Sequence, residues 1–206
     1  MAGTRRGLPA DERRSVIIET VLRLAAERNP SEITTAAIAE GMGLTQGALF
    51  RHFPNKEAVF AAVVQWVGEN LSERLKAASR STEAPLDALK AMFEAHVRFV
   101  AEHPGIPKFV FSELQKGEHS VPKREVRALM AEYVAKIVLL LDKGKLSGDV
   151  DLNVDSAAAG SLFLGTLQGL TLQSMVSGTS RDMLPRADGL FAIFRRAVEK
   201  RERDGR

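Results

Sequence analysis

The chain contains no cysteine among its 206 residues, and this absence removes several classes of site. Disulfides, cysteine-ligated zinc and thiol nucleophiles are excluded, and a reducing compartment is the expected location. Apolar runs of about 18 residues are also missing, and the N-terminus has no apolar segment typical of a secretion signal. We therefore expect a soluble, cytoplasmic protein with no membrane partner.

Catalytic and metal-binding patterns are missing as well. The histidines are scattered, without an H-E-x-x-H pair, and no G-x-S-x-G nucleophile motif occurs. These absences predict a protein that is not an enzyme and that holds neither a metal nor a cofactor. The formal net charge of +3 is too small to indicate a polyanionic partner by itself, so any DNA affinity has to come from the placement of particular side chains.

Helical periodicity dominates the chain, while alternating strand patterns and hairpin turn signals are missing. We therefore predict an all-α fold of about nine helices. Proline, glycine and asparagine place the expected helices at residues 12–28, 36–42 (capped by Thr35), 45–52, 55–78, 86–102, 106–116, 123–143, 154–177 and 183–200. The long helix from about 55 to 78 links two predicted domains, residues 1–54 and 55–206.

Three glycines, Gly41, Gly43 and Gly47, lie close together in the first domain. They form G-x-G-x-x-x-G, which is one residue longer than a dinucleotide fingerprint and follows a helix instead of a strand. The Walker pattern is absent too. The better interpretation is two short helices joined by a tight glycine turn, the second of which presents its N-terminal side chains to a DNA major groove.

The second short helix carries side chains suited to reading DNA. Gln46 can pair with an adenine edge, and Thr45 can reach a base or a phosphate. The small Gly47 and Ala48 allow a close approach, and Arg51 can reach a phosphate or a guanine. A charged residue such as Arg51, taken alone, is equally compatible with a solvated surface.

The stretch from Thr34 to Phe60 resembles the DNA-binding signature of the TetR (tetracycline repressor) family of transcriptional regulators. The resemblance lies in a set of spaced positions, namely Thr35, Ile38, Ala39, the glycine turn, Leu49, Phe50, His52, Phe53, Lys56 and Glu57. The length and the nine-helix layout are similar to the family along the whole chain. The resemblance implies a helix-turn-helix domain followed by a helical effector-binding and dimerisation domain.

The resemblance also implies roles for single residues. Thr35 would contact a phosphate. Three residues of the second short helix would face the bases, namely Gln46, Gly47 and Ala48. The family's usual phosphate contacts from tyrosine, histidine and lysine fall on Phe50, His52 and Lys56. Phe50 departs from the pattern because it has no hydroxyl to donate to a phosphate. Arg5 and Arg6 can add an arm contact to DNA or belong to a disordered arm.

The last two predicted helices carry stripes of apolar and small residues. The first stripe includes Leu162, Gly165, Gly169 and Leu172, and the second includes Phe191 and Phe194. From the residues alone, these stripes serve either the core of the monomer or a second copy of the chain. The resemblance implies a homodimer in which both helices form a four-helix bundle with their mates.

An aromatic-rich region lies between these helices and the predicted helix-turn-helix domain, residues 1–54, which is called the reading head below. The resemblance places an effector pocket there, and we expect Trp66, Phe93, Phe111 and Tyr133 to line it together with the polar His96 and Gln168. For the two polar residues, an ordinary satisfied core or surface position is the alternative.

Together these observations predict a ligand-responsive, sequence-specific DNA-binding regulator. The resemblance favours a repressor that a small, largely apolar effector releases from a palindromic operator. The alternative is an all-helical, dimeric protein-interaction module without sequence-specific DNA binding.

Overall fold

The structure is a computed structural model that describes residues 10–180 and 182–200. Within these ranges the chain folds into nine α-helices and one short 3-10 helix, which confirms the all-α prediction. The helices are α1 (Ala10–Glu27), η1 (Pro30–Glu32), α2 (Thr35–Gly41), α3 (Gln46–Phe50), α4 (Lys56–Ser79), α5 (Pro85–Glu102), α6 (Gly105–Leu114), α7 (Val121–Ser147), α8 (Ser156–Ser177) and α9 (Met183–Val198). Arg5 and Arg6 lie outside the described residues.

Side-chain caps fix where the short helices of the first domain begin. Thr34, rather than the predicted Thr35, caps α2, because its hydroxyl accepts a hydrogen bond from the Ala37 amide at 3.1 Å. Thr45 caps α3 in the same way. Between them Gly43 adopts a φ of 68°, a left-handed conformation that glycine reaches without strain, so the tight turn joins the two helices as predicted.

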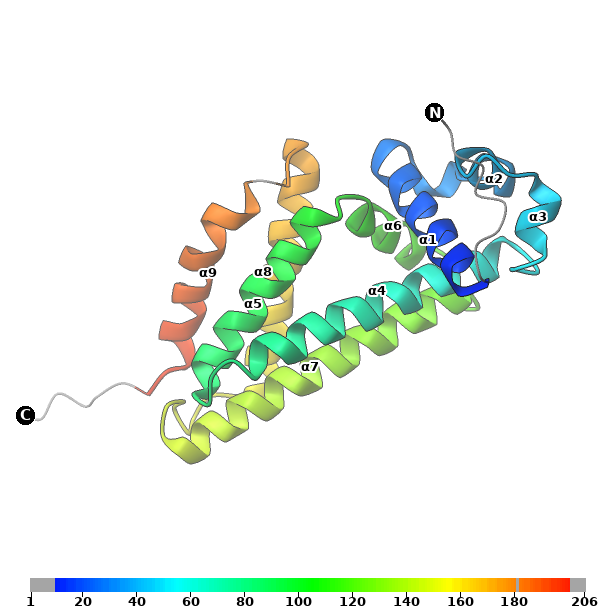
Figure 1. Cartoon of the computed structure of the whole chain (residues 1–206). Helices are drawn as coiled ribbons and strands as arrows, with labels where there is room; N and C mark the ends of the chain where they lie inside the picture. The colour runs from blue at the N-terminus through cyan, green and yellow to red at the C-terminus, as the bar shows by residue number, and fades with distance from the viewer. Residues whose placement is uncertain (1–9, 181, 201–206) are drawn as a thin grey trace, which may run out of the picture.

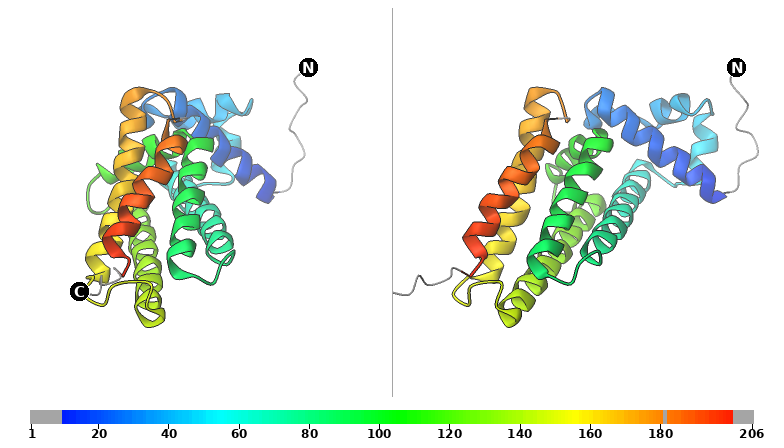
Figure 2. Two further views of the ribbon diagram at one scale, coloured as in Figure 1. Left: turned by 90° about the vertical axis from the view of Figure 1, so that its left-hand side faces the viewer. Right: turned by 60° about the vertical axis from the view of Figure 1, so that its left-hand side comes forward.

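The helices form an elongated body with α1, α2 and α3 at one end and α8 and α9 at the other (Figures 1 and 2). The long α4 connects the two ends and packs against α5 and α7. Asn55 caps α4, accepting a hydrogen bond from the Ala58 amide at 2.8 Å. The long α4 therefore leads directly from α3 into the body of the molecule.

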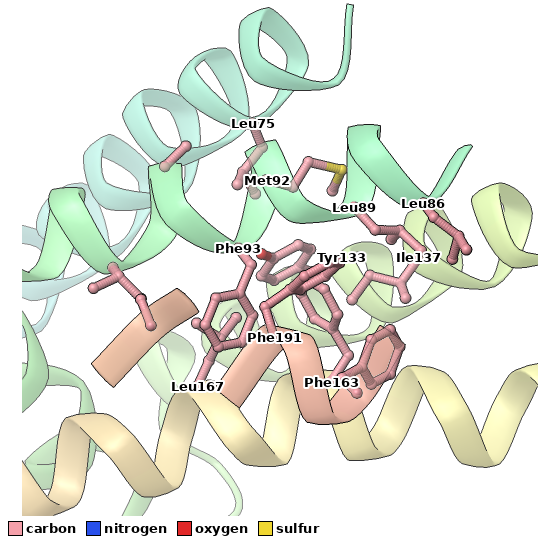
Figure 3. Packing of buried hydrophobic residues seen from close by; sticks show 14 of the residues in the cluster. Leu75, Leu86, Leu89, Met92, Phe93, Tyr133, Ile137, Phe163, Leu167 and Phe191 are labelled. Atoms are coloured by element: carbon pink, nitrogen blue, oxygen red, sulfur yellow. The ribbon is translucent and has the colours of Figure 1, made fainter. Parts of the chain in front are cut away.

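A cluster of aromatic rings forms the core at the α8 and α9 end (Figure 3). Phe163 is fully buried at its centre, with ring centroids 5.3 Å from both Phe93 and Phe194 and 6.5 Å from Phe191. The prediction that Phe191 and Phe194 face a dimer partner is therefore wrong. They share one stripe of α9, and that stripe packs onto the monomer's own core.

A second buried cluster joins the first domain to the helices beyond it. It contains apolar side chains from α1, α2, α3 and the first half of α4, together with Phe99 of α5, Phe109 of α6 and Val126 of α7. Phe60 of α4 meets Phe109 edge-on at 5.0 Å between ring centroids. The division after residue 54 stays a prediction, and the packing joins α1 to α6 directly.

Candidate nucleic-acid interface and effector cavity

The N-terminal side chains of α3 are exposed at the end of the molecule where α2 and α3 meet. Gln46 donates a hydrogen bond to the Thr35 hydroxyl at 2.6 Å, so the two helices hold this side chain between them. The amide group still has one N–H and its carbonyl oxygen free, which is what pairing with an adenine edge requires. Thr35 and Thr45 also keep their hydroxyl hydrogens as donors, because both hydroxyls accept the bonds described.

The rest of α3 divides into a buried face and an open face. Leu49 is buried against the first domain, whereas Phe50 is 44% exposed. A Cβ added at Gly47 would meet nothing within 4 Å, and Ala48 is half-buried. A flat surface can therefore approach the backbone here closely. Phe50 offers its ring for apolar contact with a sugar or a thymine methyl.

A basic cluster joins the start of α1 to the end of α3. Arg13 lies 3.3 Å from Nε2 of His52, and the guanidinium of Arg14 lies 5.1 Å from the centre of the Phe53 ring. Burial, followed by the charges of Arg13, Arg14 and Arg51, lowers the pKa of His52. The ring is therefore neutral at pH 7. With Nε2 accepting from Arg13, its proton is on Nδ1, where it can be donated to a phosphate.

Sequence reasoning did not assign Arg13 and Arg14 to this surface. The only signal in the sequence was a pair of adjacent arginines early in an amphipathic helix, which is common on ordinary surfaces. The tertiary fold brings Arg13 beside His52, two residues after α3, and adds positive charge where a DNA backbone would pass.

Lys56 is held differently from the contact that the resemblance implies. Its ammonium lies 3.4 Å from the carbonyl oxygen of Ser31 and 5.0 Å from the centre of the Phe60 ring. Burial, followed by the charge of Lys116, lowers the pKa of Lys56. The carbonyl occupies only one of the three ammonium donors, so a phosphate contact by Lys56 stays a prediction.

A cavity of about 160 Å³ lies between α4, α5, α6, α7 and α8. Its walls are mostly apolar, and four of the predicted residues, His96, Phe111, Tyr133 and Gln168, line it. The sequence also missed lining residues such as Ser72 and Lys136, because a polar residue on a long helix gives no signal of facing inward.

Trp66 and Phe93 do not line this cavity, so their prediction is corrected. Val64, Val67 and Leu71 share the stripe of α4 that faces the cavity, and Trp66 lies off that stripe, packing edge-on against His103 at 6.0 Å between ring centroids. Phe93 points into the neighbouring aromatic core, where Phe163 occupies the space beside it (Figure 3).

His96 and Tyr133, two polar residues that line the cavity, are both neutral. His96 stacks on Tyr133 with ring centroids 5.5 Å apart, and its Nδ1 lies 3.4 Å from the tyrosine hydroxyl. Burial lowers the pKa of His96 to about 4 and raises that of Tyr133 above its usual range. The Gln168 amide has only the Met130 sulfur as a partner, at 3.8 Å, which leaves most of its hydrogen-bonding capacity for a bound molecule.

The buried neutral His96 predicts a loss of stability in acid. Its folded pKa of about 4 lies below the unfolded value of 6.5, so the unfolded chain takes up the proton first as the pH falls. We expect this histidine to account for a loss of about 2 kcal/mol in the free energy of unfolding between about pH 7 and about pH 5. Urea titrations of the wild type and of His96→Gln, which cannot titrate, measure it.

The matched control is His119→Gln, which removes an exposed histidine from the loop before α7. This control should keep the wild-type dependence on pH. An equally steep dependence in His96→Gln would show that His96 is not the group responsible.

The outward faces of α8 and α9 carry uncovered apolar side chains. Of the predicted interface residues, Leu162 and Leu172 are about half exposed, and a Cβ at Gly165 or Gly169 would meet nothing within 4 Å. Ile193 of α9, 59% exposed, and Val176 of α8, 84% exposed, are further uncovered apolar side chains on these two helices. This set, Leu162, Gly165, Gly169, Leu172, Val176 and Ile193, is called the outer face below.

Among the described residues, no group of three or more histidine, cysteine, aspartate or glutamate side chains is placed to hold a metal ion. None of the helices in residues 10–180 and 182–200 has the length and apolar content needed to cross a membrane.

Comparison with known proteins agrees with this geometry. Residues 17–63 match the family model described as bacterial regulatory proteins of the tetR family, a stretch that contains α2, α3 and the start of α4. The nucleoid occlusion factor SlmA of Shewanella sp. (strain W3-18-1) is 24% identical over 165 residues, which are 80% of this chain and 84% of that protein.

Solved structures share the whole fold. The fatty acid degradation regulator FadR from Bacillus halodurans superposes with a TM-score of 0.81 at 17% identity, covering 93% of this chain and 97% of that one. A TetR transcriptional regulator from Chloroflexus aurantiacus gives 0.78 at 19% identity, covering 93% and 98%. Residues 17–63 therefore match the tetR-family model of bacterial regulatory proteins, and the chain as a whole has the fold of these solved regulators.

Proposed function

We propose that this protein is a ligand-responsive, TetR-family repressor that binds a palindromic operator as a homodimer in the cytoplasm and leaves it when a small, largely apolar effector binds. The observation that carries the proposal is the joint presence of an exposed reading helix and an apolar cavity connected by one long helix, α4. The reading helix supplies specificity, and the cavity supplies a place for a signal.

The outer face supports the homodimer. A single helix-turn-helix reads only one half-site, so a two-fold dimer is the usual way to gain specificity. Exposed leucine, valine and isoleucine beside glycines with open space above them form a surface onto which another helix can pack closely. The helices α8 and α9, which carry the outer face, lie at the end of the molecule opposite α3, so in such a dimer the two reading heads stay free (Figure 1).

The course of α4 supports coupling between the cavity and the DNA. Val64, Val67 and Leu71 of α4 form part of the cavity wall, and α4 begins at Lys56, directly after the reading head. Half-sites require recognition helices about 34 to 36 Å apart or a multiple of that spacing, so a small tilt of α4 weakens binding. The effector must bind the state with the tilted helix more tightly than the DNA-competent state, since otherwise it shifts no population.

The decisive experiment selects duplexes that bind the purified protein from a random DNA pool. Enrichment of a two-fold symmetric motif, with affinity that falls steeply with salt, is the expected result. No enrichment together with weak, sequence-independent binding would favour the helical interaction module instead.

Two substitutions in α3 and at its end separate base reading from backbone contact. Gln46→Ala is expected to cost about 1 to 3 kcal/mol of operator binding and to relax preference at one base pair of each half-site. Arg51→Ala, if Arg51 binds a phosphate, should weaken binding to all sequences alike and reduce the salt dependence by about one phosphate per subunit. Titrations against the selected operator and against single-base variants measure both.

The control for these variants is Gln65→Ala, because Gln65 is an exposed glutamine on α4 that bonds only to Glu69 in this structure. It should bind like the wild type. If Gln46→Ala lost affinity equally for every sequence, Gln46 would be a structural link to Thr35 and not a base-reading residue.

A further inference from the structure

One cation lines the cavity without an acidic partner. Lys136 of α7 is half-buried in the wall, and its ammonium donates to the Ser72 hydroxyl of α4 at 3.2 Å. Among the described residues, no carboxylate lies within the ion-pair distance of 4.0 Å. A hydroxyl satisfies one of the three ammonium donors, so this lysine retains donors for an anion.

Glu132 also lines the cavity, one helical turn before Lys136. Its side chain is exposed and makes no ion pair with Lys136. Water therefore solvates this carboxylate at the rim, while the lysine ammonium lies in the wall beside Ser72. The positive charge is consequently available to a molecule inside the cavity.

The remaining polar groups of the cavity can bind only neutral parts of a ligand. His96 and Tyr133 are both uncharged at neutral pH, and Gln168 and Thr171 carry no charge. The other lining side chains are largely aliphatic or aromatic. An ionised group placed deep in the cavity would lose its hydration without gaining an opposite charge, which is strongly unfavourable. The Lys136 and Ser72 side is therefore where a negative group is best accommodated.

The volume of the cavity limits the apolar part of the ligand. An engineered cavity of about 150 Å³ in another protein holds one benzene molecule, and the cavity here is of similar size at about 160 Å³. The apolar body is thus about as large as one aromatic ring or a short alkyl chain. A few further atoms can extend toward Lys136.

We propose that the effector is a small carboxylic acid whose apolar body fills the cavity and whose carboxylate binds the Lys136 ammonium and the Ser72 hydroxyl. This inference rests on the proposed function, since it assigns a ligand class to the proposed effector cavity. The charge pairing gives the cavity selectivity for an acid over a neutral molecule of the same shape.

The test compares two acids with neutral molecules of matched shape. Binding of 3-phenylpropanoate, octanoate and the two corresponding primary amides to the full-length protein is measured by calorimetry near neutral pH. We expect at least one acid to bind, and its amide to bind about 10-fold or more weakly, because the amide loses a charge-assisted hydrogen bond. Lys136→Gln should lower the affinity for the acid to that for its amide, and it should leave the affinity for the amide unchanged.

Two further variants guard against indirect effects. Lys136→Arg retains the charge and should preserve the preference for the acid. Lys143→Gln removes an exposed lysine from the same helix and should bind both ligands like the wild type. Equal binding of acid and amide, a preference that survives in Lys136→Gln, or no binding of either acid would each overturn the proposal.

Operator binding, measured on the same samples, separates this inference from the proposed function. Sequence-specific DNA binding without acid binding would refute only the ligand class. Acid binding at Lys136 without sequence-specific DNA binding would refute the repressor and leave the ligand class standing.

Discussion

Replacing Gly105 with alanine is expected to lower the free energy of unfolding by about 3 kcal/mol or more. Gly105 is the first residue of α6 and lies directly against α1. A Cβ there would be 2.9 Å from the carbonyl carbon of Leu22 and would overlap its oxygen, and it would be 3.1 Å from the Ala26 nitrogen. These are backbone atoms inside a helix, so they cannot rotate away as a flexible side chain would.

The same contact connects the reading head to the cavity between α4 and α8. Lys108, one turn further along α6, donates a hydrogen bond to the Ala26 carbonyl at 2.5 Å, and Phe111 of α6 lines the cavity. Separating α6 from α1 would therefore disturb both the stability and the position of α1. We expect Gly105→Ala to weaken operator binding as well.

Urea unfolding monitored by circular dichroism measures this effect, and Gly117→Ala provides the control. Gly117 has open space around its Cβ position and no positive φ, so its substitution should leave the midpoint nearly unchanged. If Gly105→Ala unfolded at the same urea concentration as the wild type, the close approach of α1 and α6 would not be a constraint in solution.

Replacing Ile193 with glutamate is expected to convert the dimer to a monomer and to lower operator affinity by at least about 100-fold, or about 2.7 kcal/mol. Ile193 is 59% exposed in the single chain, so the substitution should not disturb the monomer's own core. In the proposed dimer the new carboxylate would be buried without a partner, which strongly disfavours association.

Sedimentation measures the mass, and titration against the selected operator measures the affinity. Leu139→Glu is the matched control, because Leu139 is 57% exposed on α7 and lies outside the outer face. Leu172→Glu, on the other helix of the outer face, should reproduce the effect of Ile193→Glu. A dimer that persists in both outer-face variants would place the interface elsewhere.

The sequence predicted the local elements well because their signals are local. A capping side chain or a glycine turn acts within a few residues, and so does the Pro54-Asn55 pair before α4. The short helices and the start of α4 were therefore predicted closely. The error in the cap of α2, Thr35 in place of Thr34, concerned two adjacent threonines that are chemically equivalent as caps. The predicted end of α7 was also wrong, because the helix continues through Gly144 to Ser147.

Side-chain roles that depend on packing were predicted less well. Phe93 and Trp66 are aromatic residues of the predicted pocket region, yet one fills the core and the other packs against His103. Phe191 and Phe194 form an apolar stripe, and periodicity cannot say whether such a stripe meets its own chain or a second copy. On α9 that stripe packs into the monomer's own core, and Ile193 on the other face of the helix stays exposed.

The sequence by itself determined the helical class, the glycine turn and the side chains on the reading helix, because each follows from short-range periodicity, capping and backbone freedom. Only the tertiary structure decided that Arg13 joins His52, that Lys136 lies in the cavity wall beside Ser72, and that Gly105 lets α6 approach α1. These contacts join residues from helices distant in the sequence, and their geometry depends on how the helices cross, which no local pattern specifies.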